Sequence, residues 1–316
     1  MKRVLIVIAV GFLLAVLPFI VSGYWLGLIT QAVILGGFAM GLDLLVGFAR
    51  MPSIGHSTFF GLSGYGVALA VTRFDVAIWP AVGIGLLLSL IAALLFGPLA
   101  VRMRGLAFLT ITLAFGQLTW GLTTRWSSFT NGENGIPGIS RPSFLWDIET
   151  VVGYFYFTLL IAIAISIFII IFAESPVGIS LLGVRNSDTR MSALGYNIHS
   201  RRTIAFVVAA AVGAMYGILN VFYNKFIGPG SLSWQLSAQM LLSVVVGGPV
   251  SLWGPFLAGS GIVILKTMLI GTTQRWPMVL GLLYVVSVVF LPGGIASLLP
   301  KVRARFEKMF RGRVTE

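Results

Sequence analysis

The sequence predicts an all-α integral membrane protein, a polytopic bundle of about ten transmembrane helices with cytoplasmic N- and C-termini. The 316 residues are 58% hydrophobic and only 9% charged, and the mean hydropathy is +1.00, whereas soluble domains are about a quarter charged. Apolar runs of about 17–25 residues, the length of an α-helical span, recur from end to end. Runs such as 159–172 do not alternate between apolar and polar residues, which excludes a membrane β-barrel.

The apolar runs place ten spans along the chain. The first run is too long for the apolar core of a signal peptide and is interpreted as an uncleaved span. An even number of spans puts both termini on one side. A cytoplasmic location for them leaves most of the 21 Lys and Arg residues inside, as is usual in membrane proteins. The expected spans are 4–22, 27–48, 57–72, 77–100, 105–123, 151–173, 203–223, 235–249, 254–271 and 277–296.

Residues that the chain lacks argue against several function classes. There is no cysteine and there are only two histidines, His56 and His199, so neither thiol chemistry nor a metal site is expected. No Gly-Lys dipeptide occurs, so the chain has no P-loop for ATP, and we expect no cofactor in it. The excess of basic residues is explained by cytoplasmic loops rather than by nucleic-acid binding.

Asp43 is the only acidic residue deep inside an expected span. An ionisable group at that depth is costly and is therefore a functional candidate. It could couple a proton or sodium gradient in a secondary carrier, tie helices together through hydrogen bonds, or pair with Lys266. Lys266 could instead extend toward the membrane interface.

A Gly-x-Ser-Gly pattern at 61–64 is shared with intramembrane rhomboid proteases. Their serine needs a histidine base from another span. No span after Ser63 contains a histidine, so Ser63 is interpreted as a small packing residue.

Two Gly-rich stretches, 52–64 and 249–261, resemble each other. Transporters often contain internal repeats whose broken helices meet at the transport path. Similar composition alone would also explain the likeness, and His56 could simply hold the start of a helix. With Asp43, the candidates for the translocation path are Gly55, His56, Ser57, Gly247, Gly248 and Gly254.

The polar segment 174–202 is expected to form a short amphipathic helix in the cytoplasm. Ser175 is the expected N-cap with Pro176 at the first helical position, and Gly195 is expected to end the helix. The charged side chains Arg185, Asp188 and Arg190 are expected to project to the cytoplasm. Such a helix can lie on lipid headgroups or dock into a soluble subunit.

Two further segments lie outside the spans. The loop 124–150 contains several glycines that predict turns, and Trp126 and Trp146 are suited to the membrane interface. The basic tail 301–316 follows a permease domain expected at 1–300. It is expected to lie on the anionic membrane surface, or alternatively to contact a partner.

Five motifs together resemble the LivM-type permease subunits of branched-chain amino acid ABC importers, and the resemblance runs from about 36 to 300. AMGLDLLVG at 39–47 and SIGHSTFFGLSGY at 53–65 are similar to the family's second and third spans. RGLAF with TLAFG at 104–116 and GGPVSLWGP at 247–255 match two further family patterns. NGENG at 131–135 is similar to the family's glycine turn.

This resemblance implies an ABC importer permease in the bacterial inner membrane that works by alternating access. The implied partners are a second permease subunit, cytoplasmic ATPases that bind the ATP, and an extracytoplasmic substrate-binding protein. A gradient-coupled carrier using Asp43 and a permease for urea or short amides are the alternatives. Segment 174–202 would meet the ATPase, although Ile179 and Asn186 depart from the family pattern and Asp188 replaces its glutamate. The family's coupling residues match Gly178, Arg185, Asp188, Ala193 and Gly195.

Overall fold

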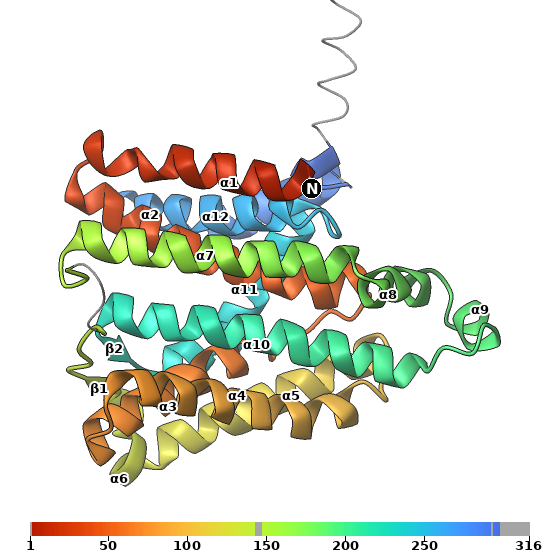
Figure 1. The fold of residues 1–316 in the computed structure, drawn as a ribbon, viewed down its shortest axis with the longest axis horizontal. Helices are drawn as coiled ribbons and strands as arrows, with labels where there is room; N and C mark the ends of the chain where they lie inside the picture. Colours follow the sequence, from red (N-terminus) through yellow and green to blue (C-terminus); the bar gives the residue numbers. More distant parts are fainter. Residues whose placement is uncertain (1, 143–146, 292, 298–316) are drawn as a thin grey trace, which may run out of the picture.

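The computed structural model describes residues 2–142, 147–291 and 293–297, and this part of the chain is almost entirely helical (Figure 1). The tail 301–316 and Trp146 lie outside the described residues. Two short strands, β1 (Ile136–Pro137) and β2 (Phe226–Ile227), pair antiparallel. The α-helices are α1 (Lys2–Ala15), α2 (Gly23–Asp43), α3 (Ser57–Phe74), α4 (Ile78–Ala100), α5 (Leu106–Arg125), α6 (Ser127–Thr130), α7 (Val151–Glu174), α8 (Pro176–Asn186), α9 (Asp188–Ala193), α10 (Ile198–Asn224), α11 (Trp234–Gly247), α12 (Trp253–Thr272) and α13 (Trp276–Phe290).

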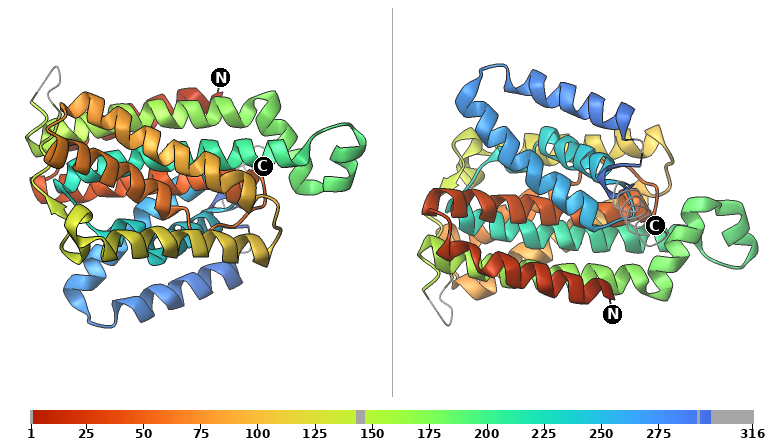
Figure 2. Two further views of the ribbon diagram at one scale, coloured as in Figure 1. Left: turned by 90° about the horizontal axis from the view of Figure 1, so that it is seen from below. Right: turned by 90° about the horizontal axis from the view of Figure 1, so that it is seen from above.

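The long helices run roughly side by side along one axis of the molecule (Figures 1 and 2). β1, β2 and α6 lie at one end of the bundle, which we call the β end. At the opposite end α8 and α9 extend beyond the other helices, and we call this the α9 end. The described N-terminal helix starts at the α9 end.

Seven helical segments in the described residues are long and apolar enough to cross a membrane, so the chain is a polytopic helical membrane protein. Three more helices, α1, α3 and α11, fall short of the same combination of length and hydropathy. The expected number of about ten spans therefore remains a prediction. The seven segments are Gly23–Phe48, Ile78–Ala100, Leu106–Arg125, Val151–Glu174, Ile198–Asn224, Trp253–Thr272 and Trp276–Ser297.

Helices α2 and α10 form the centre of the bundle. α2 packs against α7, α10, α11 and α12, and α10 packs against α3 and α4. Because α2 is apolar on all sides, it can be surrounded in this way. Phe38 of α2, Phe60 of α3 and Tyr216 of α10 are among the largest fully buried side chains. Apolar helices on the outside, such as α4, expose most of their surface and are suited to face lipid.

Two helices, α3 and α11, start inside the protein rather than at one of its ends. The backbone N–H of Ser57, in the first turn of α3, donates to Ser237 Oγ of α11 at 2.7 Å. The Ser237 hydroxyl donates to Ser57 Oγ at 2.8 Å, and the Ser57 hydroxyl donates to the carbonyl of Ser233 at 2.8 Å. Ser57 and Ser237 have no exposed surface. The two helix N-termini therefore meet in the interior.

The segments that lead to this junction enter from opposite ends. Residues 49–56 follow α2 from the α9 end, and 225–233 follow α10 from the β end. Discontinuous helices that meet inside the protein also occur at the repeats of transporters. Residues 249–252 form the connection from α11 to α12 and lie outside this junction. The expected relation between 52–64 and 249–261 stays a prediction.

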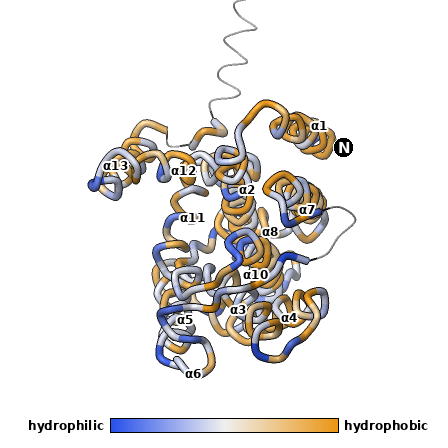
Figure 3. The backbone as a smooth tube through the Cα atoms, turned by 90° about the vertical axis from the view of Figure 1, so that its left-hand side faces the viewer, coloured by the Kyte–Doolittle hydropathy of each residue, from blue (hydrophilic) through white to orange (hydrophobic). Residues whose placement is uncertain are grey.

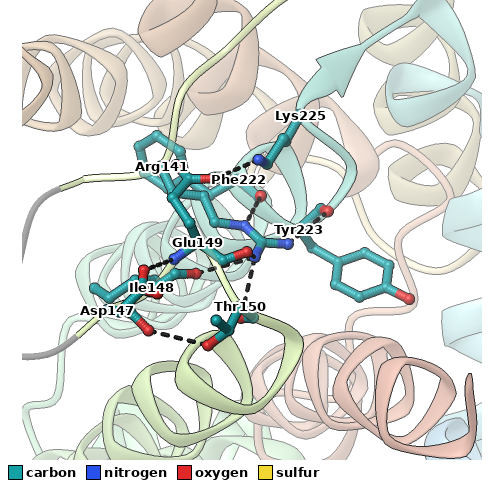
Figure 4. A network of polar contacts seen from close by, with 8 residues as sticks. All are labelled: Arg141, Asp147, Ile148, Glu149, Thr150, Phe222, Tyr223 and Lys225. Atoms are coloured by element: carbon teal, nitrogen blue, oxygen red, sulfur yellow. Dashed lines mark hydrogen bonds and ion pairs between the residues drawn. The ribbon is translucent and has the colours of Figure 1, made fainter. Parts of the chain in front are cut away.

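Arg141 connects several segments of the chain at the β end (Figure 4). Its guanidinium donates hydrogen bonds to the carbonyls of Ile148, Glu149, Thr150 and Phe222 at 2.9–3.3 Å. The carboxylate of Glu149 pairs with Lys225, and the hydrogen bond from Lys225 lowers the pKa of Glu149. These contacts join the loop 124–150 to the start of α7 and the end of α10. The turns predicted in that loop are confirmed by the positive φ angles of its glycines at 132, 135 and 138.

Candidate functional site

The corner between α7 and α8 is built as the sequence predicted. The hydroxyl of Ser175 accepts a hydrogen bond from the N–H of Gly178 at 3.3 Å, and Pro176 is the first residue of α8. A Cβ at Gly178 would collide with the carbonyl oxygens of Phe172 and Ala173. Glycine at this position therefore lets α8 turn sharply off the end of α7.

The segment after this corner contains two helices instead of the single expected helix. Ser187 is extended, and its hydroxyl accepts a hydrogen bond from the N–H of Arg190 at 3.3 Å. This second N-cap ends α8 and starts α9. Gly195 ends α9 with a φ of 84°, as predicted. The break between α8 and α9 lies at a serine between two polar residues. The sequence around it has no change in apolar pattern, so the break was not predicted.

The Asp188 side chain points back to the bundle rather than outward. Its carboxylate accepts two hydrogen bonds from Nη2 of Arg202, at 2.9 and 3.1 Å, and lies 3.2 Å from Nη1 of Arg104. Arg202 belongs to the first turns of α10, and Arg104 lies between α4 and α5. The carboxylate therefore ties the α8–α9 segment to two other parts of the bundle.

The inner face of α8 is apolar and the outer surface of the segment is partly apolar too. Leu181 and Val184 are buried, where α8 packs on α7, α10 and the π-helix η2 (Leu44–Phe48). Arg185 is half-buried and Ala193 is exposed. The outermost apolar side chains are Ile179, Leu194 and Tyr196, exposed by 61%, 72% and 40%. We call Ile179, Ala193, Leu194 and Tyr196 the tip surface.

The Asp43 carboxylate has no exposed surface and holds a strained turn. It accepts hydrogen bonds from the N–H of Val250 at 2.9 Å and of Leu252 at 3.1 Å. Val250 and Leu252 have φ angles of 76° and 62°, and Gly248 has 98°. Positive φ is unfavourable for a side chain such as valine and costs about 1–3 kcal/mol. Asp43 therefore stabilises a turn whose backbone conformation is unfavourable for Val250 and Leu252.

This geometry bears on two of the three roles considered for Asp43. The hydrogen-bonded aspartate that ties helices together is the arrangement present, since Asp43 ends α2 and the turn joins α11 to α12. The pairing with Lys266 is wrong, because the Lys266 ammonium lies over the Trp276 ring, 5.2 Å from its centroid. The π-helix η2 follows Asp43 directly and packs against α8.

The residues predicted for the translocation path lie at two separate places in the structure. Gly55 packs against the Thr112 carbonyl of α5, and Ser57 lies in the α3–α11 junction. The His56 ring has no exposed surface and is surrounded by Phe38, Phe59 and Phe206. At the α9 end, the backbones at Gly247 and Gly254 approach each other closely beside the turn held by Asp43, and Gly248 belongs to that turn.

Exposed polar side chains on the adjoining helices α5 and α11, which we call the α5–α11 face, were missed by the sequence reasoning. Gln117 of α5 and Gln235 of α11 are exposed, and Gln239 of α11 is half-buried. α5 also exposes Thr110 at helical spacing from Gln117. Next to this face α13 packs on α11 and α12 yet buries only Leu280, and it stands away from the rest of the bundle (Figure 3). Amide side chains in apolar spans are the signal that could have identified this face.

Replacing Asp43 tests its role in the turn. Asp43→Leu leaves two buried N–H groups without an acceptor, and we expect the free energy of unfolding to fall by about 3 kcal/mol or more. Asp43→Asn keeps one acceptor, so the loss should be about half as large. Lys266→Leu is the matched control and should change little. Unfolding in detergent measures all three, and equal losses for Asp43→Leu and Lys266→Leu would contradict this assignment.

Comparison with known proteins agrees with this architecture. Residues 24–291 match the family described as the permease component of the branched-chain amino acid transport system. The chain is 25% identical to the high-affinity branched-chain amino acid transport system permease protein LivM of Escherichia coli strain K12, over 97% of this chain and 77% of the relative. It is 26% identical to LivM of Salmonella typhimurium strain LT2, over 96% and 75%. No solved structure matches significantly.

The family match extends from the start of α2 to the end of α13, and so it includes the Asp43 turn, the α3–α11 junction and the α8–α9 segment. The chain therefore belongs to the family of branched-chain amino acid transport permeases.

Proposed function

We propose that the chain is a membrane-spanning subunit of an ATP-driven importer for branched-chain or other amino acids. The family match over 24–291 is the observation that carries this proposal. The chain contains no P-loop, so separate ATPase subunits bind the ATP. No bond of the substrate is made or broken, and the protein is not an enzyme. Its location is the bacterial inner membrane.

In this proposal the α9 end faces the cytoplasm, and α1, α3 and α11 complete ten spans. The distribution of positive charge supports this orientation, because basic residues collect on the cytoplasmic side. The tail 301–316 follows α13 on the same side as a basic extension of the permease domain. Among the described residues, the basic ones at the α9 end are Lys2, Arg3, Arg50, Arg102, Arg104, Arg185, Arg190, Arg201 and Arg202, against Arg73, Arg125, Arg141, Lys225 and Arg275 at the β end.

The tip surface is proposed to dock into a groove of the ATPase. Helices α8 and α9 extend beyond the bundle, and a segment with exposed apolar side chains is suited to a groove on a partner. Gly178 and Gly195 shape the segment, Asp188 anchors it, and Arg185 and Ala193 lie along it. Ile179, which replaces a basic residue of the family pattern, makes this docking more apolar.

Movement of the docked segment has a direct route into the membrane. α8 packs on η2, η2 follows Asp43, and Asp43 holds the turn between α11 and α12. A change at α8 therefore reaches α11 through a few adjoining contacts. Alternating access requires that ATP favour one of the two arrangements of these contacts.

The substrate path is proposed to run along the α5–α11 face, where a second permease subunit completes it. Gln117, Gln235 and Gln239 offer amide groups to a polar substrate there. The N-terminus of α11 lies next to this face, and the positive end of a helix dipole favours the carboxylate of an amino acid. A substrate-binding protein docks at the β end and delivers the substrate.

A gradient-coupled carrier is the alternative from a different class. The geometry at Asp43 supports it less well, because both carboxylate oxygens already accept backbone hydrogen bonds and the group is fully buried. A permease for urea or short amides would have the same architecture. Only the substrate distinguishes that alternative from an amino acid permease.

Reconstitution in vesicles tests the proposed function. The chain is assembled with its second permease subunit, ATPases and binding protein, and uptake of labelled leucine is measured. We expect uptake only with ATP, no loss when proton and sodium gradients are collapsed, and at least half of the activity in Asp43→Asn. Uptake by the chain alone, driven by a gradient, would contradict the proposal. Competition by urea but not by leucine would reassign the substrate.

Loss of the Asp188 carboxylate should uncouple transport from ATP hydrolysis. In Asp188→Asn we expect transport per ATP to fall about tenfold, equivalent to about 1.4 kcal/mol of lost coupling, because the α8–α9 segment loses its anchor on Arg202 and Arg104. Asp188→Glu should restore coupling. Glu174→Gln is the matched control, since its pairing with Arg3 is exposed. An unchanged ratio of substrate to ATP in Asp188→Asn would refute the anchoring role.

A further inference from the structure

A groove with an apolar lining lies between α1 and α12, with α2 and α7 as its floor. It measures about 390 Å³ and is open along one side. Figure 3 shows α1 and α12 on either side of α2 at this edge of the bundle. Lining side chains include Val10 of α1, Val33 of α2, Ala162 of α7 and Leu257 of α12. None of the features used for the proposed transport path lies in it.

The groove has the length and position of one leaflet of a membrane. Its α1 wall extends from Arg3 to Leu14, which at 1.5 Å per residue is about 16 Å. Half of a hydrocarbon core of about 30 Å is about 15 Å. The groove runs parallel to the helices and reaches the α9 end at Arg3. A lipid chain in that leaflet would have the same direction and the same length.

The charged residue of the groove lining indicates which kind of ligand the groove binds. The only charged residue in the lining is Arg3, at the end where the headgroup of such a lipid would lie. Arg3 is 3.7 Å from Glu174, an exposed and therefore weak ion pair, so its guanidinium is available to a phosphate. The lining has no carboxylate to pair with the ammonium group of an amino acid substrate.

A flexible acyl chain is suited to an open apolar groove of this length, because it needs no hydrogen-bond partner along the wall.

We propose that this groove binds an acyl chain of an anionic glycerophospholipid from the leaflet at the α9 end, with the phosphate at Arg3. Ser251, Leu252 and Trp253 form part of the wall. The bound chain thus packs against the turn held by Asp43, and it stabilises that turn from the side opposite the α8 contact. This inference does not depend on which substrate the permease carries.

The test is lipid binding by the purified, delipidated full chain, measured by native mass spectrometry during titration with phosphatidylglycerol or phosphatidylcholine of identical acyl chains. We expect one tightly bound phosphatidylglycerol. Arg3→Gln should lower the preference over phosphatidylcholine about fivefold, the effect of one basic residue at a membrane surface. Arg275→Gln, at the β end, is the matched control and should keep the preference.

A second pair of variants tests the groove itself. Val10 lines it and is 44% exposed, whereas Ile8 of the same helix is 49% exposed and lies outside it. Val10→Trp should lower the affinity for both lipids at least tenfold, and Ile8→Trp should not change it. Equal binding in Val10→Trp and Ile8→Trp, equal affinity of the wild type for both lipids, or loss of the bound lipid when the second permease subunit assembles would each overturn the proposal. Arg3→Gln remains informative if Val10→Trp fails to fold.

Discussion

The arrangement of this permease depends on the contact between the Asp43 carboxylate and two backbone N–H groups, those of Val250 and Leu252. Each non-glycine residue with positive φ costs about 1–3 kcal/mol, and a hydrogen bond to a charged group contributes about 1.5–3 kcal/mol. The two effects are of similar size, so the turn forms because Asp43 is present. This side chain connects the end of α2 to the turn between α11 and α12. Burying a carboxylate is costly, but its two hydrogen bonds offset that cost. An apolar side chain at this position could not accept them.

The contact between Asp43 and the α11–α12 turn lies next to η2, α11 and the lipid groove. On one side, η2 connects Asp43 to α8 and to the anchored segment at the α9 end. On the other side, α11 leads from the turn to the α3–α11 junction and the polar face with Gln239. The lipid groove reaches the turn through Leu252. Because the turn directly follows α11, a change in the turn can shift that helix.

Much of the helical framework could be predicted from apolar runs alone. The expected spans 77–100 and 151–173 nearly coincide with α4 and α7, because a change from apolar to polar residues marks both ends of each. The helix N-cap at Ser175 and the helix end at Gly195 were also predicted from the sequence. Contacts between distant residues were not predictable. The donors to Asp43 are more than 200 residues away in the sequence, and Arg104 and Arg202 reach Asp188 from the α4–α5 connection and from α10. The family resemblance indicated the function, whereas the geometry of Asp43 came only from the structure.

The central claim is that movement at the α8–α9 segment reaches the α5–α11 face through Asp43. The chain has no native cysteine, so the thiol introduced by Gln239→Cys is a single reporter on that face. The most direct measurement is its rate of reaction with a water-soluble thiol reagent in the assembled transporter, with and without ATP. We predict a severalfold dependence on ATP that disappears when Asp43→Leu is added, while the ATPase stays bound. An equal dependence on ATP in the Asp43→Leu background would contradict the claim.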